Sequence, residues 1–535
     1  MHEHEPSNPL HDISGPNAYW SRTNAAESQP EVHKPLTWDF WKIAAERAMR
    51  GQAVDFGILP PREVDVPKDV NRRVWALFYG RVALNVDFFR RMMDLVPGAS
   101  GADFERDYLG TVRPDVPSYK SRRRYLPIFV KGTLLTLRIE SVILKDYHET
   151  IAWWKQQVAP QTIADLDGSR ERYYDALRRF ERVQRNHCAN SSIAARKFAE
   201  LTALAKQVGL PELASKLSVG YGDTEDTRVM TDLWRVSRGQ STLDEFLAHN
   251  GYHGPSEGDL SCPSWREDPR PIVALLDKYR ALNADTSPVA TENKRRQERL
   301  TAEEQVLAAL QPSKRRKARK LFADAEKFMK LREMGKVSYI RTVDAGRAAC
   351  NARGRQLVQM GKLDSATDVY YLTAAEAFDR LPTDTRQLVS ERKQLFDRYC
   401  KLEIPVTWTG NPIPQQPAAE PATKVSVVKG IGVSAGVVEG RVRLVLDQNG
   451  VDPMEPGEIL VTRTTDPSWG AFFLVAGGLV IDIGGPMSHG AIIAREIGVP
   501  CVIGTNVGTR QLQDGDWIRV DGNSGEVTIL ERQAA

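Results

Sequence analysis

One histidine near the end of the chain, His489, stands where a glycine pair meets an apolar run, in the stretch DIGGPMSHGAIIAREIG at 482–498. Ser488 is a good helix N-cap, the residues after the histidine are mostly apolar, and Gly498 suits the position after the last turn. The pattern therefore predicts a helix that starts at this histidine. A histidine in such a place can be a packed or surface residue, a metal ligand, a general base or a carrier of phosphate.

The start of a helix favours an anion, because its unpaired backbone N–H groups and its dipole both attract negative charge. The same field disfavours a protonated imidazole, so it keeps the ring neutral and nucleophilic. No second His or Cys lies at ligand spacing, which argues against a metal site. Ser488 and His489 are adjacent and cannot face each other, and no GxSxG motif is present, which argues against a hydrolase. These arguments favour a phosphate carrier and leave a capping or surface histidine open.

The length and composition of the chain limit the number of domains and the class of protein. The 535 residues allow two to four domains, and 41% hydrophobic with 27% charged residues is typical of a soluble globular protein. A net charge of +4 does not demand a polyanionic partner, no apolar run is long enough to span a membrane, and the N-terminus lacks the apolar core of a secretory signal. Five scattered cysteines without a CxxC pair fit a reduced compartment. We expect a cytoplasmic protein with no metal and no membrane or nucleic-acid partner.

Apolar residues at three- and four-residue spacing predict a mainly α-helical domain over residues 1–402, most clearly at 74–96, 172–184 and 291–360. The stretch GYHGPSEGDLSCPSWREDP at 251–269 interrupts this pattern with glycines and prolines. It is expected to form a loop.

The pattern changes after a proline-rich segment at 403–424, which is expected to be an extended linker. Beyond it, at 425–535, short β-branched runs alternate with glycines. The predicted fold class is multi-domain, with a mainly α-helical substrate domain followed by a small α/β domain on a tether.

Arg332 and Lys336 lie one turn apart in the predicted helix and continue its apolar stripe. The stripe consists of Phe322, Ala325, Met329, Ile340 and Val343. Two cations on an inward face are costly unless an anion meets them, and a transferring phosphoryl group is such an anion. Glu333, at the edge of the stripe, offers the alternative of an internal ion pair, which the sequence leaves open.

The stretches GGPMSHGAIIAREIGVPCVIGT and LQDGDWIRVDGNSGEVTIL resemble the swivelling phosphohistidine domain of the phosphoenolpyruvate-utilising (dikinase) family, over about 428–532. The resemblance implies that His489 is phosphorylated and dephosphorylated in each cycle. It also implies that Gly484, Gly485 and Ser488 cradle the phosphoryl group.

Two features separate the chain from pyruvate-using members of that family. Met487 stands where those members usually carry a threonine, and its Met-Ser-His-Gly form is similar to rifampin phosphotransferase and phenylphosphate synthase. Pyruvate-using members also place a (β/α)8 barrel after the histidine domain, whereas about 45 residues follow His489 here. Phosphoenolpyruvate or pyruvate chemistry is therefore not expected.

No ATP-binding module is recognisable in residues 1–400, which contain neither GxxxxGK[ST] nor the β-rich pattern of an ATP-grasp domain. In phenylphosphate synthase the ATP-handling part and the histidine part are separate subunits. That resemblance implies that a separate ATP-grasp subunit binds ATP and Mg²⁺, and that this chain holds no cofactor firmly.

The helical region resembles, more loosely, the central substrate domain of rifampin phosphotransferase and its relatives. This resemblance implies that His253 and Glu257 handle the proton of an acceptor hydroxyl, and that Glu333, Arg22 and Trp38 contact the substrate. The alternative is that His253 and Glu257 have only a structural role, in a hydrogen-bond network that stabilises the loop. The shared patterns are W-x-R-x-N at Trp20, PLTW at 35–38, the loop at 251–269, R-E-x-x-K at 332–336 and DVYYL at 368–372.

We therefore expect one subunit of an ATP-dependent, dikinase-type phosphotransferase. His489 would carry the β-phosphate of ATP, with release of AMP and phosphate, and pass it to a phenolic hydroxyl near Arg332 and Lys336. Two alternatives stay open: a phosphohistidine relay or regulatory subunit without its own acceptor, and an antibiotic-modifying phosphotransferase.

Overall fold

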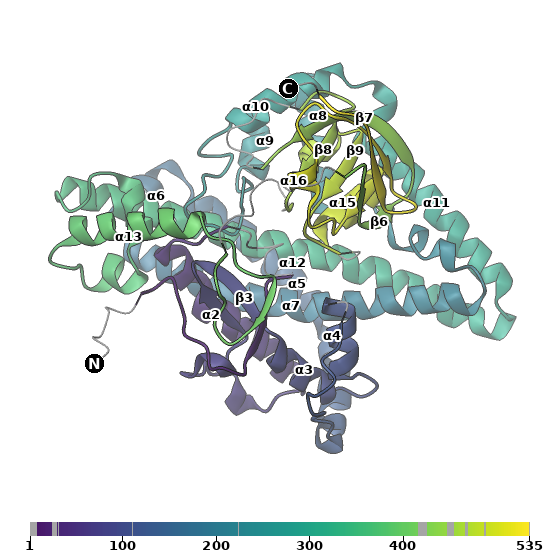
Figure 1. The fold of residues 1–535 in the computed structure, drawn as a ribbon, viewed down its shortest axis with the longest axis horizontal. Helices are drawn as coiled ribbons and strands as arrows, with labels where there is room; N and C mark the ends of the chain where they lie inside the picture. Colours follow the sequence, from purple (N-terminus) through teal and green to yellow (C-terminus); the bar gives the residue numbers. More distant parts are fainter. Residues whose placement is uncertain are drawn as a thin grey trace. The chain divides into compact units, whose positions relative to one another are not determined.

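The protein is described here by a computed structural model. It covers residues 8–23, 29, 31–109, 111–222, 224–415, 425–446, 454–465, 469–485 and 488–533, and of residues 107, 226, 285 and 489 it describes the backbone alone. None of the helices in these ranges combines the length and apolar character that crossing a bilayer needs. The two longest helices of the described ranges are α7 (Ser169–Gln207) and α12 (Pro312–Gln359) (Figure 1).

The chain forms two compact units, which we call unit 1 and unit 2. Both α7 and α12 run from one unit into the other, so the predicted domain boundaries at 402 and 425 stay predictions. Unit 1 comprises Met1–Asn190, Gly258–Ser261 and Gly335–Ala418, and unit 2 comprises Ser191–Glu257, Cys262–Met334 and Ala419–Ala535.

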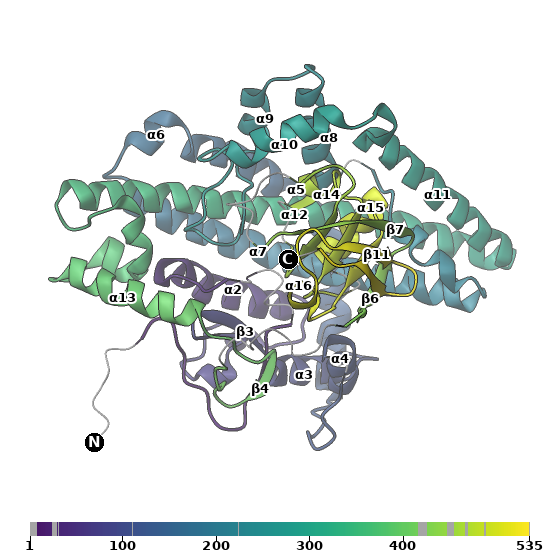
Figure 2. The same cartoon turned by 45° about the horizontal axis from the view of Figure 1, so that its top comes forward.

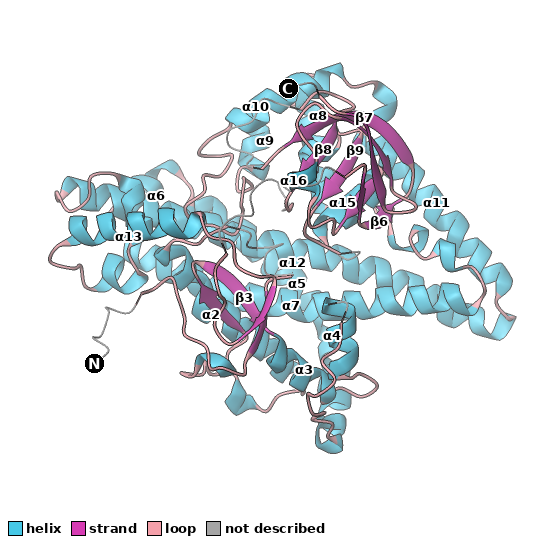
Figure 3. Ribbon diagram, viewed as in Figure 1, coloured by secondary structure: helices cyan, strands magenta, loops and turns pink. Residues whose placement is uncertain are grey.

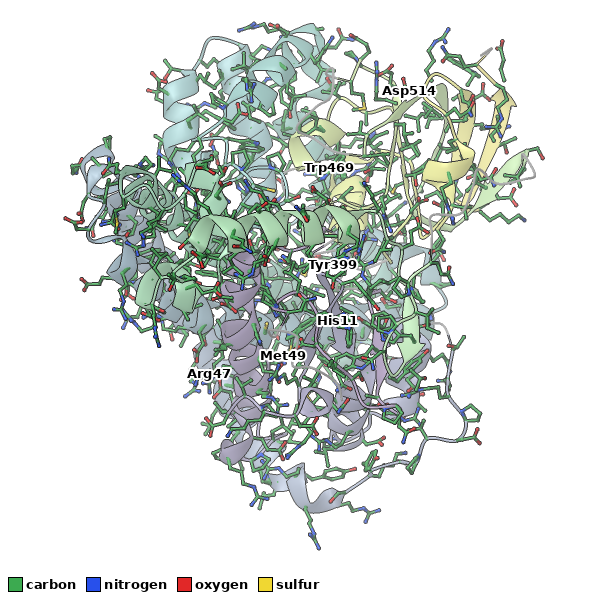
Figure 4. The ribbon with its side chains drawn as sticks, turned by 60° about the vertical axis from the view of Figure 1, so that its left-hand side comes forward. His11, Arg47, Met49, Tyr399, Trp469 and Asp514 are labelled. Atoms are coloured by element: carbon green, nitrogen blue, oxygen red, sulfur yellow. The ribbon has the colours of Figure 1, made fainter. Side chains whose placement is uncertain are left out.

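Unit 1 is mainly helical, as the three- and four-residue spacing predicts. Tyr79 packs between His11 and Tyr399, with ring centroids 4.4 and 5.3 Å away, and so fixes the N-terminal segment near the last helix of the unit (Figure 4). Besides parts of α7 and α12, its helices are α2 (Pro35–Asp55), α3 (Val86–Asp94), α4 (Gly101–Leu109), α5 (Tyr125–Gln157), α6 (Pro160–Ala164) and α13 (Thr385–Cys400).

One segment that the sequence predicts as helix, residues 74–96, is instead a β-hairpin followed by α3. The hairpin consists of β2 (Trp75–Phe78) and β3 (Arg81–Asn85). Tyr79 and Gly80 turn the chain between them with φ angles of +50° and +71°. The helix prediction was wrong because both strands are buried on both faces, so their apolar residues show no alternation.

The segment predicted as a linker, 403–424, contributes a strand to the same sheet. β4 (Thr407–Thr409) pairs with β1 (Tyr19–Ser21) in the order β2-β3-β1-β4, with Trp408 opposite Trp20. Trp408 is 7% exposed and its ring lies 5.3 Å from that of Phe78. The first part of the expected linker therefore packs into unit 1, because it buries apolar side chains there. Residues 416–424 lie outside the described residues.

Unit 2 combines helices with an eight-stranded sheet in the order β5-β12-β11-β7-β8-β9-β10-β6 (Figure 3). The predicted fold class is confirmed: a helical body is followed by a C-terminal α/β part. The helices of the body are α8 (Glu225–Ser237), α9 (Leu243–Asn250), α10 (Arg270–Ala281) and α11 (Pro288–Ala309). The strands are β5 (Val427–Lys429), β6 (Ile431–Ser434), β7 (Val437–Leu444), β8 (Ile459–Thr462), β9 (Gly478–Ile481), β10 (Cys501–Ile503), β11 (Trp517–Asp521) and β12 (Glu526–Glu531).

Strands β7 to β10 are parallel neighbours, and β8, β9 and β10 are buried on both faces. In β8, Ile459 and Val461 join one core while Leu460 points to the other, as the two-residue period of a strand requires. The second core also contains residues of two short helices, α14 (Gly470–Phe473) and α15 (His489–Ile497), which lie against the sheet in Figure 2. The third short helix of this part is α16 (Gly508–Gln511).

The strand at 407–409 gives a direct test of the packing of unit 1. Replacing Trp408 by Ala removes a large buried side chain, so we expect the free energy of unfolding of unit 1 to fall by about 3–5 kcal/mol. Val406→Ala, in the same segment but 54% exposed, should change it by less than about 0.5 kcal/mol. Urea unfolding measures both. Equal, small effects would mean that this segment is a free linker after all.

Candidate functional site

Helix α15 begins at the residue that the sequence predicts. The Ser488 hydroxyl accepts a hydrogen bond from the Ala491 N–H at 3.2 Å, and Gly498 ends the helix with a φ angle of +81°. Both predicted helix signals, the N-cap and the terminal glycine, are therefore confirmed. The backbone of His489 lies in the first turn, where unpaired N–H groups and the positive end of the helix dipole favour an anion.

Gly484, Gly485 and Ser488 lie on the loop between β9 and α15. Gly484 has a φ angle of +149°, and a Cβ atom there would lie 2.5 Å from Ile503 Cδ1, so a larger residue would not fit. The Gly485 carbonyl accepts a hydrogen bond from the Ser488 N–H at 2.9 Å. Residues 486–487 and the side chain of His489 lie outside the described residues. A phosphate cradle on this loop stays a prediction.

The sequence argument missed the residue that anchors this loop, Asp482. It is 4% exposed, and its Oδ1 accepts hydrogen bonds from Thr505 Oγ1 at 2.5 Å and the Gly508 N–H at 2.6 Å. Its Oδ2 accepts from the N–H of Thr509, at 3.1 Å, and from the hydroxyl of the same residue. The carboxylate thus ties the end of β9 to the segment after β10 and fixes the point from which the loop to His489 departs. An Asp that ends an apolar strand just before a glycine pair is the signal that could have indicated it.

The predicted pair of cations lies on α12. Lys336 is 5% exposed, as the helical wheel predicts, whereas the Arg332 side chain is 22% exposed. The Arg332 guanidinium lies 2.8 Å from the Glu333 carboxylate, so the internal ion pair that the sequence left open is formed. A phosphoryl group would have to compete with Glu333 for Arg332. A role for these residues in phosphoryl transfer stays a prediction.

The predicted loop at 251–269 is free of helix and strand, and it holds His253 and Glu257 together. His253 Nδ1 is hydrogen-bonded to the Glu257 carboxylate, and the two residues are 1% and 4% exposed. The Trp265 N–H donates to the His253 carbonyl at 2.7 Å, and the rings of these residues are 5.4 Å apart. These contacts hold the loop in one conformation. Proton transfer from an acceptor by His253 or Glu257 stays a prediction.

The two predicted substrate contacts near the N-terminus, Arg22 and Trp38, are 5% and 3% exposed. The Arg22 N–H donates to the Val406 carbonyl at 2.8 Å, beside the β1–β4 pair. Trp38 belongs to an apolar core that also contains Leu77 and Tyr399. Both residues therefore have structural contacts in unit 1, and their contact with a substrate stays a prediction. Within the described ranges, no group of three or more His, Cys, Asp or Glu side chains could hold a metal ion.

Comparison with known proteins matches two segments of the chain. Residues 454–525 match the family described as the mobile domain of PEP-utilising enzymes, and residues 189–333 match the rifampicin phosphotransferase fourth domain. Residues 454–525 are therefore similar to the mobile domain of phosphoenolpyruvate-utilising enzymes. The family resemblance recognised from the sequence is thus confirmed for these residues, and the first match contains α15 with His489.

Several curated relatives match part of this chain. A rifampicin phosphotransferase from a Streptomyces species is 35% identical over 318 residues, which are 57% of this chain and 36% of the relative. The rifampicin phosphotransferase of Bacillus subtilis is 31% identical over 319 residues, with the same two shares. The structure of Thermococcus kodakaraensis aconitase X (holo-form) is 25% identical, covers 20% of this chain and 98% of its own, and has a TM-score of 0.17. This chain spans about a third of the length of the curated relatives it matches.

The anchoring role of Asp482 can be tested by mutation. Asp482→Ala leaves the N–H groups of Gly508 and Thr509 buried without their acceptor, so we expect the free energy of unfolding of the C-terminal part to fall by about 3 kcal/mol. Asp482→Asn keeps one acceptor oxygen and should lose about half as much. Urea unfolding followed by hydrogen–deuterium exchange of the β9 and β10 amides measures both. An Asp482→Ala protein as stable as the wild type would contradict the anchoring role.

Proposed function

We propose that this chain carries the phosphohistidine part and the acceptor part of an ATP-dependent phosphotransferase. A separate ATP-grasp subunit would bind ATP and Mg²⁺ and place the β-phosphate on His489, releasing AMP and phosphate. The histidine would then give the phosphoryl group to a hydroxyl of a small molecule in the cytoplasm. One observation carries the proposal: His489 begins α15, at a helix start that favours an anion, inside the segment matched by the mobile-domain family.

The acceptor that we favour is a hydroxyl group of an antibiotic of the rifampicin kind. The curated relatives at 31–35% identity are named rifampicin phosphotransferases, and residues 189–333 match a domain of those enzymes. These similarities support the antibiotic-modifying alternative over the phenolic acceptor that the sequence led us to expect. Phenol is therefore kept as a comparison in the test below.

Each predicted site residue has a role in the transfer of the phosphoryl group. The acceptor oxygen attacks phosphorus, the P–N bond to His489 breaks, and its electron pair returns to the imidazole ring. Arg332 and Lys336 would neutralise the charge on the phosphoryl oxygens, with Glu333 released from Arg332 when the phosphoryl group arrives. The pair of His253 and Glu257 would receive the proton of the acceptor hydroxyl.

Chemical charging tests this step without the ATP-binding partner. Potassium phosphoramidate transfers phosphate to histidine, so the chain can be charged, desalted and mixed with rifampicin, phenol or buffer. We expect rifampicin to discharge His489 fastest and to appear as its phosphate ester, followed by mass spectrometry. His489→Ala should form no ester.

Arg332→Ala is expected to be charged normally at His489 and to discharge about a hundredfold more slowly, since one group that stabilises the transition state is lost. Lys330→Ala, on the same helix and paired with Glu326, is the matched control and should behave as wild type. Discharge that no acceptor accelerates would favour the relay alternative, and discharge by phenol alone would favour the phenolic one. Ester formation by His489→Ala would contradict the proposal.

A further inference from the structure

The C-terminal end of α15 is bound to the helical part of unit 2. Ile493 shares a hydrophobic core with Val229 and Leu233 of α8. Three residues further along α15, the Glu496 carboxylate accepts a hydrogen bond from the Gly220 N–H at 2.9 Å. The helix that presents His489 at its start is therefore held at its end, by a surface made of the 217–222 segment, α8 and α11. We call this surface the α8–α11 surface.

Arg295 of α11 closes over the last turn of α15. A Cβ atom on Gly498 would come within 1.6 Å of Arg295 Nη2, so the guanidinium lies directly against this glycine. A Cβ atom on Gly220 would likewise meet the Arg295 backbone, at 2.5 Å from its carbonyl oxygen. Two glycines thus permit the close approach on both sides of Arg295. Its positive charge also lies at the negative end of the α15 dipole, where a cation is stabilising.

A second carboxylate, that of Glu292, faces the same place from α11. Glu292 and Glu496 line one small pocket together with Thr227, Met230 and Leu474. Glu292 also lies against the neighbouring loop, since a Cβ atom on Gly222 would be 2.7 Å from its Oε1. Two like-charged carboxylates that line the same small pocket hold a proton more tightly than either would in water.

Groups around Glu496 both raise and lower the pKa of its carboxyl group. Burial, with a smaller contribution from Glu292, raises the pKa of Glu496 to about 7, against the Gly220 hydrogen bond and the charges of Arg495 and Arg295. Part of the Glu496 side chain reaches the surface, but its carboxylate is closely surrounded by protein. Two neighbours of Glu496 interact with further groups: Tyr221 with Arg299, Glu303 and Glu326, and Arg495 with Cys501 on β10. On α8, Glu225 and Arg228 form an ion pair with each other.

We propose that the α8–α11 surface is a docking site for the phosphohistidine domain of this chain, and that docking there takes up one proton between Glu292 and Glu496. The inference rests on the proposed function, because a domain that carries phosphate between two sites must be able to leave this surface. When the domain leaves, Glu496 is exposed to water and its proton is lost at neutral pH.

The direction of the pH effect follows from the two states of Glu496. Its ordinary pKa is 4.5 and its docked value is about 7, so the docked state holds a proton that the undocked state lacks between these values. The extra docking stability is complete below pH 4.5, falls as the pH rises, and is lost above about pH 7. One pKa unit corresponds to a factor of ten, so docking should weaken by tenfold or more between about pH 5.5 and about pH 8.

Hydrogen–deuterium exchange of the full chain tests the inference. After correction for intrinsic exchange rates, protection of residues 217–222 in the wild type should fall by about tenfold or more from pH 5.5 to pH 8. Glu496→Gln, which imitates the protonated carboxyl group, should stay protected at both pH values. Glu292→Gln should move the midpoint to lower pH, since it removes a like charge. Glu304→Gln, exposed on the same helix, is the matched control and should follow the wild type.

Two results would overturn the inference: protection of residues 217–222 that does not depend on pH in the wild type, or a Glu496→Gln protein that loses protection in parallel with the wild type. The amides of β9 and β10 report whether the C-terminal part stays folded throughout. The exchange experiment needs neither a phosphate donor nor an acceptor. It therefore fails or succeeds separately from the discharge of His489, which tests the proposed function.

Discussion

The structure depends on one local constraint, the fixed start of α15. A histidine can use the field of a helix start only if the chain that leads into the helix is held in place. Here Ser488 caps the first turn, and the Asp482 carboxylate ties the end of β9 to the neighbouring loop through four hydrogen bonds. The sheet also determines where α15 begins. Because β9 and β10 are parallel neighbours, the chain must cross between them, and α15 is that crossing. His489 is thereby presented at the carboxyl-terminal edge of the strands.

The two ends of α15 have different tasks. Its start carries the candidate phosphate site. Its end is held by Gly220 through Glu496 and lies against Arg295 of α11 through Gly498. Both segments matched by known families, 189–333 and 454–525, lie almost wholly in unit 2, where they share a hydrophobic core. Both segments that match a family model therefore fall almost wholly in one compact part of the structure.

Local features of the sequence predicted the fold best where the signal is contained in a few neighbouring residues. The start and end of α15 follow from Ser488 and Gly498, and the loop at 251–269 follows from its glycines and prolines. The hairpin at 75–85 was missed because a strand buried on both faces looks like a helix segment of the same composition. The strand at 407–409 was missed because its burial depends on β1, nearly four hundred residues earlier in the chain.

The features of the candidate site were also predicted only where the signal lies in neighbouring residues. The helix start at His489 could be read from adjacent residues, whereas the anchoring by Asp482 depends on Thr505, Gly508 and Thr509, which only the folded sheet brings close. The Arg332–Glu333 ion pair was foreseen as an alternative because both residues are neighbours on one helix. The helical-wheel pattern did not predict that Arg332 is partly exposed while Lys336 is buried.

The central claim is that the start of α15 makes His489 the phosphate acceptor of this chain. The most direct measurement is the rate at which each histidine of the folded protein reacts with potassium phosphoramidate, resolved by mass spectrometry under non-acidic conditions. The account predicts that His489 is phosphorylated first and that the adduct is labile to acid. Exposed histidines such as His148 and His249 reacting as fast as His489, or His489 not reacting at all, would contradict it.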